Sequence, residues 1–241
     1  MADYEELHKW NLPIKEAVKL QVELSKKVSL SNGFDKIRRI AGVDIAFSKD
    51  RGLGYGAIVI LDYSTLNIIE TASSVVNVTF PYIPGLLTFR EGPIFLEAWK
   101  KVKVPPDVVM FDGQGIAHPR NLGLAAHMGL WINIPSIGVA KSRLVGDYEE
   151  PEPERGSSTT LTYKGKKIGE VVRTRYGIKP LFISPGHLCS FETATRLVID
   201  TAVKYRLPEP TRLAHKEAAK VKEAYLSSAG PDETVQSYLN F

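Results

Sequence analysis

The chain has 241 residues, of which 44% are hydrophobic, so it can bury one sizeable globular core. The net charge of +4 and an isoelectric point of about 9.0 permit nucleic-acid binding without demanding it. A single cysteine, Cys189, excludes an intrachain disulfide framework, and the N-terminus lacks the apolar stretch of a signal peptide. No apolar run has the length of a membrane span, and no oligomerisation signature is visible, so we expect a cytoplasmic monomer.

The first third of the chain reads as one helix followed by an antiparallel meander. Residues 13–28 carry a broken apolar stripe, and Pro13 suits the first turn of a helix. Three apolar runs follow, separated by glycine, aspartate, serine and asparagine, and this spacing predicts three antiparallel strands. They lie at 39–47, 55–62 and 66–76.

The pattern changes after FPYIPG at 80–85, where two prolines exclude regular structure. Residues 88–102 read as a helix. PDVVMFDG, which contains Asp112, is a continuous apolar run typical of a strand buried on both faces. A helix near 120–132 and a short strand at 136–140 come next, and this alternation predicts a parallel portion of the sheet.

The remainder reads as a hairpin, a further short strand and two helices, the helices capped by Ser190 and Thr211. These elements are expected at 159–163, 167–174, 180–183, 190–205 and 211–226. The whole pattern predicts a mixed α/β fold whose sheet is antiparallel at first and parallel later, flanked by helices. We expect residues 1–226 to form a single domain and 227–241 a polar tail.

Asp44 lies within AGVDIAF, a run that otherwise reads as a buried strand. Because successive strand residues face opposite sides, Asp44 shares its side with Gly42 and Ala46, which predicts space above the carboxylate. Burying even a neutral polar group without a partner costs roughly 2–7 kcal/mol, and a charge costs more. We therefore expect a cation, a metal ion or water in an open cleft to meet Asp44.

Two further acids complete a candidate site. Asp112 closes the fourth strand immediately before Gly113, and Glu91 is expected to open the preceding helix. If the first and fourth strands are neighbours, these carboxylates converge with Asp44, and they cannot all ionise without a cation between them. Oxygen ligands favour Mg²⁺, with Mn²⁺ as a substitute, and indicate phosphoryl chemistry. Taken singly, Asp112 reads as a turn former and Glu91 as a partner of the helix dipole, so a purely structural reading stays open.

Six segments, in order and spacing, resemble motifs of the endonuclease V family of deoxyinosine-directed nucleases. They are AGVDIAF, FPYIPGLLTFREGP, DGQGIAHPR, IGVAKSRL, ISPGHL and EPTRLAH. The resemblance covers about residues 4–225 and implies a ribonuclease H-like fold. It also implies Mg²⁺-dependent hydrolysis of the second phosphodiester bond 3′ to a deoxyinosine, which leaves a 3′-hydroxyl and a 5′-phosphate without excising the base.

The resemblance implies catalytic roles for five matching residues. Asp44 and Asp112 match the Mg²⁺-binding aspartates, and Glu91 matches a third catalytic acid. Lys141 matches a lysine at the scissile phosphate, and His215 matches a histidine beside the metal, with a role left open.

The resemblance also implies residues that recognise the lesion. A wedge that separates the strands, with Tyr82 at its tip, matches Pro81, Tyr82, Ile83 and Pro84. The neighbourhood of a pocket for the flipped hypoxanthine matches Gly85, Leu86, Gly113, His118 and Gly138. Arginines within or beside the motifs are expected to contact phosphates, although the first could instead pair with an acid and hold Glu91. They are Arg90, Arg120, Arg143 and Arg212.

Three alternatives stay open at this point. The same site could act on inosine in RNA, where a 2′-hydroxyl is present. A binding module could recognise damaged DNA without cutting it, although such a module has no use for three converging carboxylates. A junction resolvase could share the fold, but the proline-framed Tyr82 and the pocket glycines disfavour it.

Overall fold

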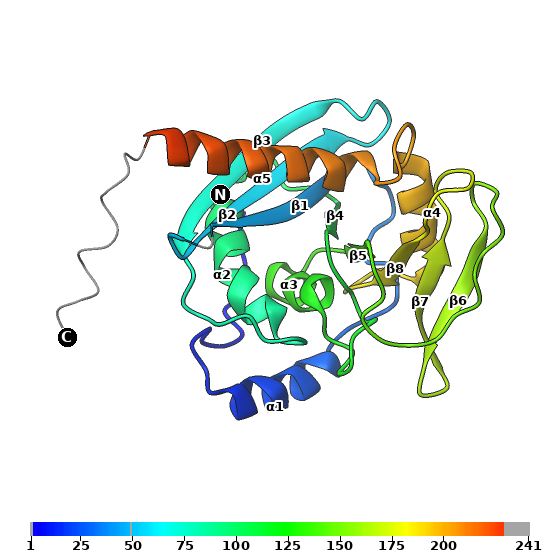
Figure 1. The fold of residues 1–241 in the computed structure, drawn as a ribbon, viewed down its shortest axis with the longest axis horizontal. Helices are drawn as coiled ribbons and strands as arrows, with labels where there is room; N and C mark the ends of the chain where they lie inside the picture. Colours follow the sequence, from blue (N-terminus) through cyan, green and yellow to red (C-terminus); the bar gives the residue numbers. More distant parts are fainter. Residues whose placement is uncertain (1, 49, 229–241) are drawn as a thin grey trace.

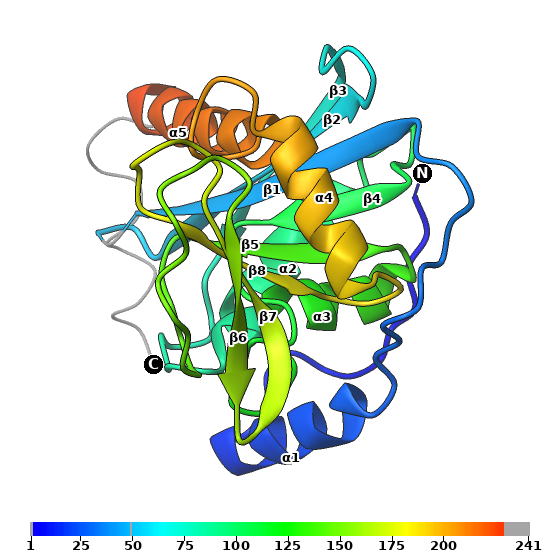
Figure 2. The ribbon, with the colours of Figure 1, turned by 90° about the vertical axis from the view of Figure 1, so that its right-hand side faces the viewer.

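The computed structural model describes residues 2–48 and 50–228, and an eight-stranded mixed sheet forms its centre (Figures 1 and 2). The strands are β1 Arg39–Ser48, β2 Leu53–Asp62, β3 Ile68–Asn77, β4 Val108–Phe111, β5 Ser136–Ala140, β6 Ser158–Tyr163, β7 Lys166–Val172 and β8 Leu181–Pro185. They are ordered β3-β2-β1-β4-β5-β8-β7-β6. Only the β1–β4 and β4–β5 pairs are parallel, so the parallel part is confined to the centre of the sheet.

Helices cover both faces of this sheet. They are α1 Ile14–Ser25, α2 Leu87–Trp99, α3 Leu124–Ile132, α4 Phe191–Thr201 and α5 Glu209–Ser228. α2 and α3 pack on one face, whereas α5 crosses β1 and β2 on the other, and α4 packs there against β7 and β8 (Figure 1). The predicted ribonuclease H-like mixed sheet flanked by helices is confirmed.

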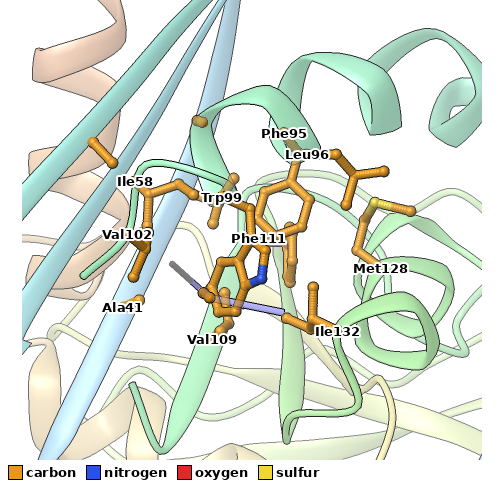
Figure 3. Close-up of a cluster of buried hydrophobic side chains, with 14 of the residues drawn as sticks. Ala41, Ile58, Phe95, Leu96, Trp99, Val102, Val109, Phe111, Met128 and Ile132 are labelled. Atoms are coloured by element: carbon orange, nitrogen blue, oxygen red, sulfur yellow. The ribbon is translucent and has the colours of Figure 1, made fainter. Parts of the chain in front are cut away.

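Alternation along the central strands separates two cores. Val109 and Phe111 of β4 point into the core under α2, where Trp99 and Phe95 fill the space between helix and sheet (Figure 3). Met110 of β4 points into the opposite core. Because both faces are covered, the central strands are apolar throughout, as the sequence pattern indicates.

The boundaries of the last two helices differ from expectation. α4 ends at Thr201 rather than at 205, because Ala202 leaves helical geometry and the Arg155 guanidinium donates to its carbonyl. α5 begins at Glu209, so Thr211 lies inside the helix and its hydroxyl donates to the Pro208 carbonyl instead of capping the start.

The predicted cap at Ser190 is confirmed, since its hydroxyl accepts from the Thr193 N–H at 3.2 Å. α5 extends through Ser228, so the first two residues of the expected tail belong to the helix. The rest of that tail, 229–241, lies outside the described residues. Across 2–48 and 50–228, no helix combines the length and the apolarity needed to cross a membrane.

Candidate active site

Asp44 lies on the face of β1 that α5 covers, beside Gly42. The helix comes so close that a Cβ on Gly42 would lie 2.0 Å from the carbonyl group of Pro210. The space expected above this small neighbour is therefore filled by helix backbone rather than left as an open cleft. The close approach brings His215 to the carboxylate, and His215 Nδ1 lies 2.9 Å from Asp44 Oδ2.

Parallel pairing brings Asp112 and Lys141 to Asp44. Val43 pairs with Phe111, and the Asp112 N–H donates to the Val43 carbonyl at 3.2 Å. Lys141 directly follows β5, which runs parallel to β4, and its ammonium forms an ion pair with Asp112. The sequence expectation that these strand ends converge is therefore met.

Glu91 reaches the same site from α2. It is the fifth residue of the helix rather than its opening residue, so it does not serve the first turn, and it is only 9% exposed. Burial, followed by the negative charges of Asp44 and Asp112, raises the pKa of Glu91 to about 8. Burial and Asp112 also raise the pKa of Asp44. Without a cation, the cluster therefore retains protons at neutral pH.

The N-terminal segment packs against α2 at Gly92, the residue that follows Glu91. Trp10 lies against Gly92 of α2, where a Cβ would sit 2.4 Å from the indole ring. The same indole stacks on Trp131 of α3 with 4.7 Å between ring centroids. Sequence analysis missed this contact because Trp10 lies outside the six motifs; the only signal was a glycine inside a helix.

Asp44, Asp112 and His215 form a candidate metal site. One ligand atom from each lies within 4.8 Å of the other two. Two carboxylate oxygens and an imidazole nitrogen suit a divalent cation, and oxygen-rich sets favour Mg²⁺ or Mn²⁺. The donor set fits such an ion. The raised pKa of Glu91 also fits it, because a bound cation would offset the repulsion among the carboxylates. The sequence predicted the two aspartates as ligands; the geometry adds His215.

A cavity of about 340 Å³ opens beside the carboxylates. Asp112 and Lys141 line one part of it, and the wedge residues Tyr82, Ile83 and Pro84 line another. Three of the expected pocket residues line the cavity as well: Gly85, Gly113 and His118. A cavity of this size has room for a flat heterocycle.

Two of the expected pocket residues lie behind the cavity wall. Leu86 is buried in an apolar cluster with Phe89. Gly138 lies under the loop that follows β4, where a Cβ would sit 2.1 Å from the Gly115 nitrogen. Both therefore shape the wall without facing the cavity.

His118 holds the turn at Gly85 as a neutral imidazole. Its Nε2–H donates to the Gly85 carbonyl at 2.9 Å, and its Nδ1 accepts from the Arg120 N–H at 3.2 Å. Burial, followed by the nearby Arg120 charge, lowers the pKa of His118 to about 4. The Arg120 guanidinium donates to the same Gly85 carbonyl and to Gln21, so it supports this turn from inside.

The wedge loop presents Tyr82 to solvent. Its side chain is 70% exposed between Pro81 and Pro84. Arg90 donates to the Phe80 carbonyl at 2.9 Å and lies over the Phe47 ring at 4.6 Å, so it anchors the start of the loop instead of pairing with an acid.

The other two candidate arginines differ from each other. Arg143 lines the cavity and pairs with Asp147 at 3.5 Å, which leaves it at the mouth of the site. Arg212 pairs with Glu209 and lies over the ring of Tyr205. Sequence analysis did not select Arg206, whose guanidinium donates to the Lys141 carbonyl at 3.0 Å.

Comparison with known proteins agrees with this geometry. The endonuclease V family model matches residues 22–216. The chain belongs to the endonuclease V family. An endonuclease V of Thermosipho melanesiensis is 51% identical over 223 residues, which cover 92% of this chain and 97% of that protein. The predicted resemblance is thereby confirmed.

Solved endonuclease V structures share the whole fold. A Bacillus subtilis endonuclease V has a TM-score of 0.89 at 31% identity and covers 94% of this chain and 100% of its own. A Ciona intestinalis endonuclease V, in complex with a 24mer DNA containing an inosine followed by a ribo-adenosine, has a TM-score of 0.75 at 30% identity, over 88% and 98% of the two chains. As an endonuclease V family member the chain is a nuclease, so a binding module without cleavage is rejected.

The neutral His118 predicts acid sensitivity in this endonuclease V. Its pKa in the folded protein, about 4, lies below the ordinary histidine value of 6.5, so protons bind preferentially to the unfolded chain. The stabilisation is complete above pH 6.5 and is lost as the pH falls toward 4. Between pH 7.5 and 4.5 this linkage amounts to about 2.5 kcal/mol.

We expect the free energy of unfolding of the wild type to fall more steeply over this range than that of His118→Gln, whose amide can still donate to Gly85. Denaturant titrations at several pH values measure the difference. The other titratable groups are present in both proteins, so their contributions to the pH dependence of unfolding cancel. Parallel pH curves would contradict the assignment.

Proposed function

We propose that this endonuclease V cleaves DNA containing deoxyinosine at the second phosphodiester bond 3′ to the lesion, with Mg²⁺, leaving a 3′-hydroxyl and a 5′-phosphate. The observation that carries the proposal is the juxtaposition of Asp44, Asp112 and His215 with a 340 Å³ cavity and an exposed wedge at Tyr82. The inosine-containing DNA bound by the Ciona intestinalis relative supports the choice of substrate.

The wedge and the cavity set the register of cleavage. A hypoxanthine rotated out of the helix enters the cavity between Gly85 and Gly113, and the Tyr82 ring fills the gap that the base leaves. Asp112 and Lys141 line the same cavity, so a phosphate on the 3′ side of the flipped base comes to lie at the carboxylates. The base is therefore recognised in the cavity, whereas the phosphodiester bond is cleaved at the carboxylates.

The charged residues then divide the chemistry. Asp44 and Asp112, together with His215, would hold the cation, and Mg²⁺ there would supply positive charge that stabilises the scissile phosphate. Lys141, which lies beside Asp112, donates to a phosphate oxygen as charge develops. Glu91 becomes an ionised carboxylate when the cation offsets its two acidic neighbours, and it orients and deprotonates the attacking water.

Inosine in RNA is a second candidate substrate. The DNA of the Ciona intestinalis complex carries a ribonucleotide directly after the inosine, so that relative accepts a 2′-hydroxyl at this position. Cleavage of matched deoxyinosine and inosine strands by this chain distinguishes the two substrates. We expect faster cleavage of the deoxyinosine strand.

The carboxylates are tested on an end-labelled duplex with one deoxyinosine, incubated with Mg²⁺ or with a chelator. The wild type should nick one bond beyond the lesion's 3′ neighbouring bond, only with Mg²⁺. Asp44→Asn and Asp112→Asn should each lower the rate by more than about 100-fold, because each replaces a negatively charged ligand of the cation by a neutral amide.

The matched control is Glu97→Gln, which removes an exposed carboxylate on the same helix as Glu91 and should leave the rate unchanged. Near-wild-type cleavage by either aspartate variant, or cleavage by the wild type in the presence of the chelator, would contradict the assignment of the metal site. A nick at another bond would contradict the proposed register.

Tyr82→Ala tests the wedge. The ring supports the unpaired strand by stacking, an interaction worth roughly 1–3 kcal/mol per base, so we expect about tenfold weaker binding to a deoxyinosine duplex. Binding to an undamaged duplex should change little, because no base is flipped there. Equilibrium binding in chelator measures both affinities. Unchanged discrimination between the two duplexes would show that Tyr82 is no wedge.

A further inference from the structure

We propose that a basic surface beside the catalytic site, made of residues 174–180 and 203–206, binds the phosphate backbone of the DNA on the 3′ side of the cleaved bond. We name this surface the basic shelf. The inference rests on the proposed function and extends it to residues that lie outside the family motifs recognised in the sequence.

Hydrogen bonds lock the two segments of the basic shelf together. The Thr174 hydroxyl donates to the Arg206 carbonyl at 2.7 Å, and the Arg175 guanidinium donates to the Lys204 carbonyl at 2.8 Å. Arg206 in turn donates to the Pro180 carbonyl at 2.7 Å. The surface is therefore preformed, and a ligand does not have to order it.

The exposed chemistry of the basic shelf matches a nucleic-acid backbone. Its two segments, TRYGIKP and VKYR, contain four cations and no acid, although the acidic segment 149–154 lies next to them, where the Gly177 N–H donates to the Pro153 carbonyl at 2.9 Å. Arg175, Lys179 and Lys204 are exposed, and Tyr176 is 73% exposed. Lysine and arginine contact phosphates, and tyrosine hydroxyls also donate to phosphate oxygens.

Arg206 joins the basic shelf to the catalytic site. Its guanidinium donates to the Lys141 carbonyl at 3.0 Å, and the Lys141 ammonium pairs with Asp112. Lys141 and Asp112 also form part of the lining of the cavity, whereas Arg206 does not. Contacts therefore link the cavity, these two residues and the basic shelf in this order.

This order assigns the basic shelf to one flank of the substrate. With the flipped base in the cavity, the strand runs in the 3′ direction to the phosphate at Asp112 and leaves the site beyond it. The basic shelf is the cationic surface that it meets there. Of the candidate arginines, Arg90 and Arg120 donate to the Phe80 and Gly85 carbonyls, so they belong to the wedge side of the cavity.

The test uses the full-length triple variant Arg175→Gln, Lys179→Gln, Lys204→Gln, which leaves Arg206 and all catalytic residues intact. The matched control, called the α1 control, removes three exposed lysines from α1 and its C-cap: Lys15→Gln, Lys19→Gln, Lys26→Gln. Binding to a deoxyinosine duplex is measured in chelator over a range of salt concentrations. We expect the slope of log K against log salt to fall by up to about 3 in the shelf variant, and affinity to fall about tenfold or more.

Two shortened duplexes then locate the contact, one trimmed 3′ of the cleaved bond and one trimmed equally 5′ of the deoxyinosine. Trimming the 3′ flank should weaken the wild type and the α1 control but barely affect the shelf variant. Trimming the 5′ flank should weaken all three equally. Unchanged binding by the shelf variant, or equal sensitivity of the wild type and the shelf variant to 3′ trimming, would overturn the inference.

The results with the wild type distinguish a failure of the basic-shelf inference from a failure of the proposed function. If the wild type prefers the deoxyinosine duplex over an undamaged one and nicks it with Mg²⁺, the proposed function stands whatever the shelf variant does. If the wild type shows neither property, the proposed function fails, and the inference about the flank fails with it.

Discussion

Repulsion among three carboxylates is the constraint on which the rest of this structure depends. Asp44 and Asp112 lie side by side because β1 and β4 are parallel, and Glu91 reaches them from a buried turn of α2. His215 and Lys141 only partly offset the effects that raise the pKa of Asp44, and Arg90 does the same for Glu91, so the pKa of both carboxyl groups stays raised. The same cluster of carboxylates, although it costs free energy through repulsion and burial, provides a site for a divalent cation.

Much of the surrounding structure holds these charges in place. Gly42 lets α5 lie close against β1, which brings His215 to Asp44, and Gly92 leaves room for the Trp10 ring against α2. The Arg90 and Arg120 side chains donate to backbone carbonyls, and these hydrogen bonds hold the wedge loop and the turn at its end in place. Cations that can meet the substrate are therefore found elsewhere, at Lys141, Arg143 and the basic shelf.

The sequence predicted what local patterns determine. Alternation and apolar runs identified the central strands, and parallel pairing then placed Asp44, Asp112 and Lys141 together. Local patterns could not predict the depth of Glu91 or the contact between His215 and Asp44, which are 171 residues apart; only the family resemblance placed His215 beside the metal site. The role of Arg90 could not be predicted either, because its acceptor is a backbone carbonyl, which every residue has.

The most direct test of the carboxylate account is proton release on metal binding. Calorimetric titration with Mn²⁺ at pH 7, in buffers of different ionisation enthalpy, counts the protons released. With a pKa of about 8, Glu91 is mostly protonated before the ion binds, so the wild type should release close to one proton per ion and Glu91→Gln almost none. Binding without proton release by the wild type, or equal release by both proteins, would contradict the account.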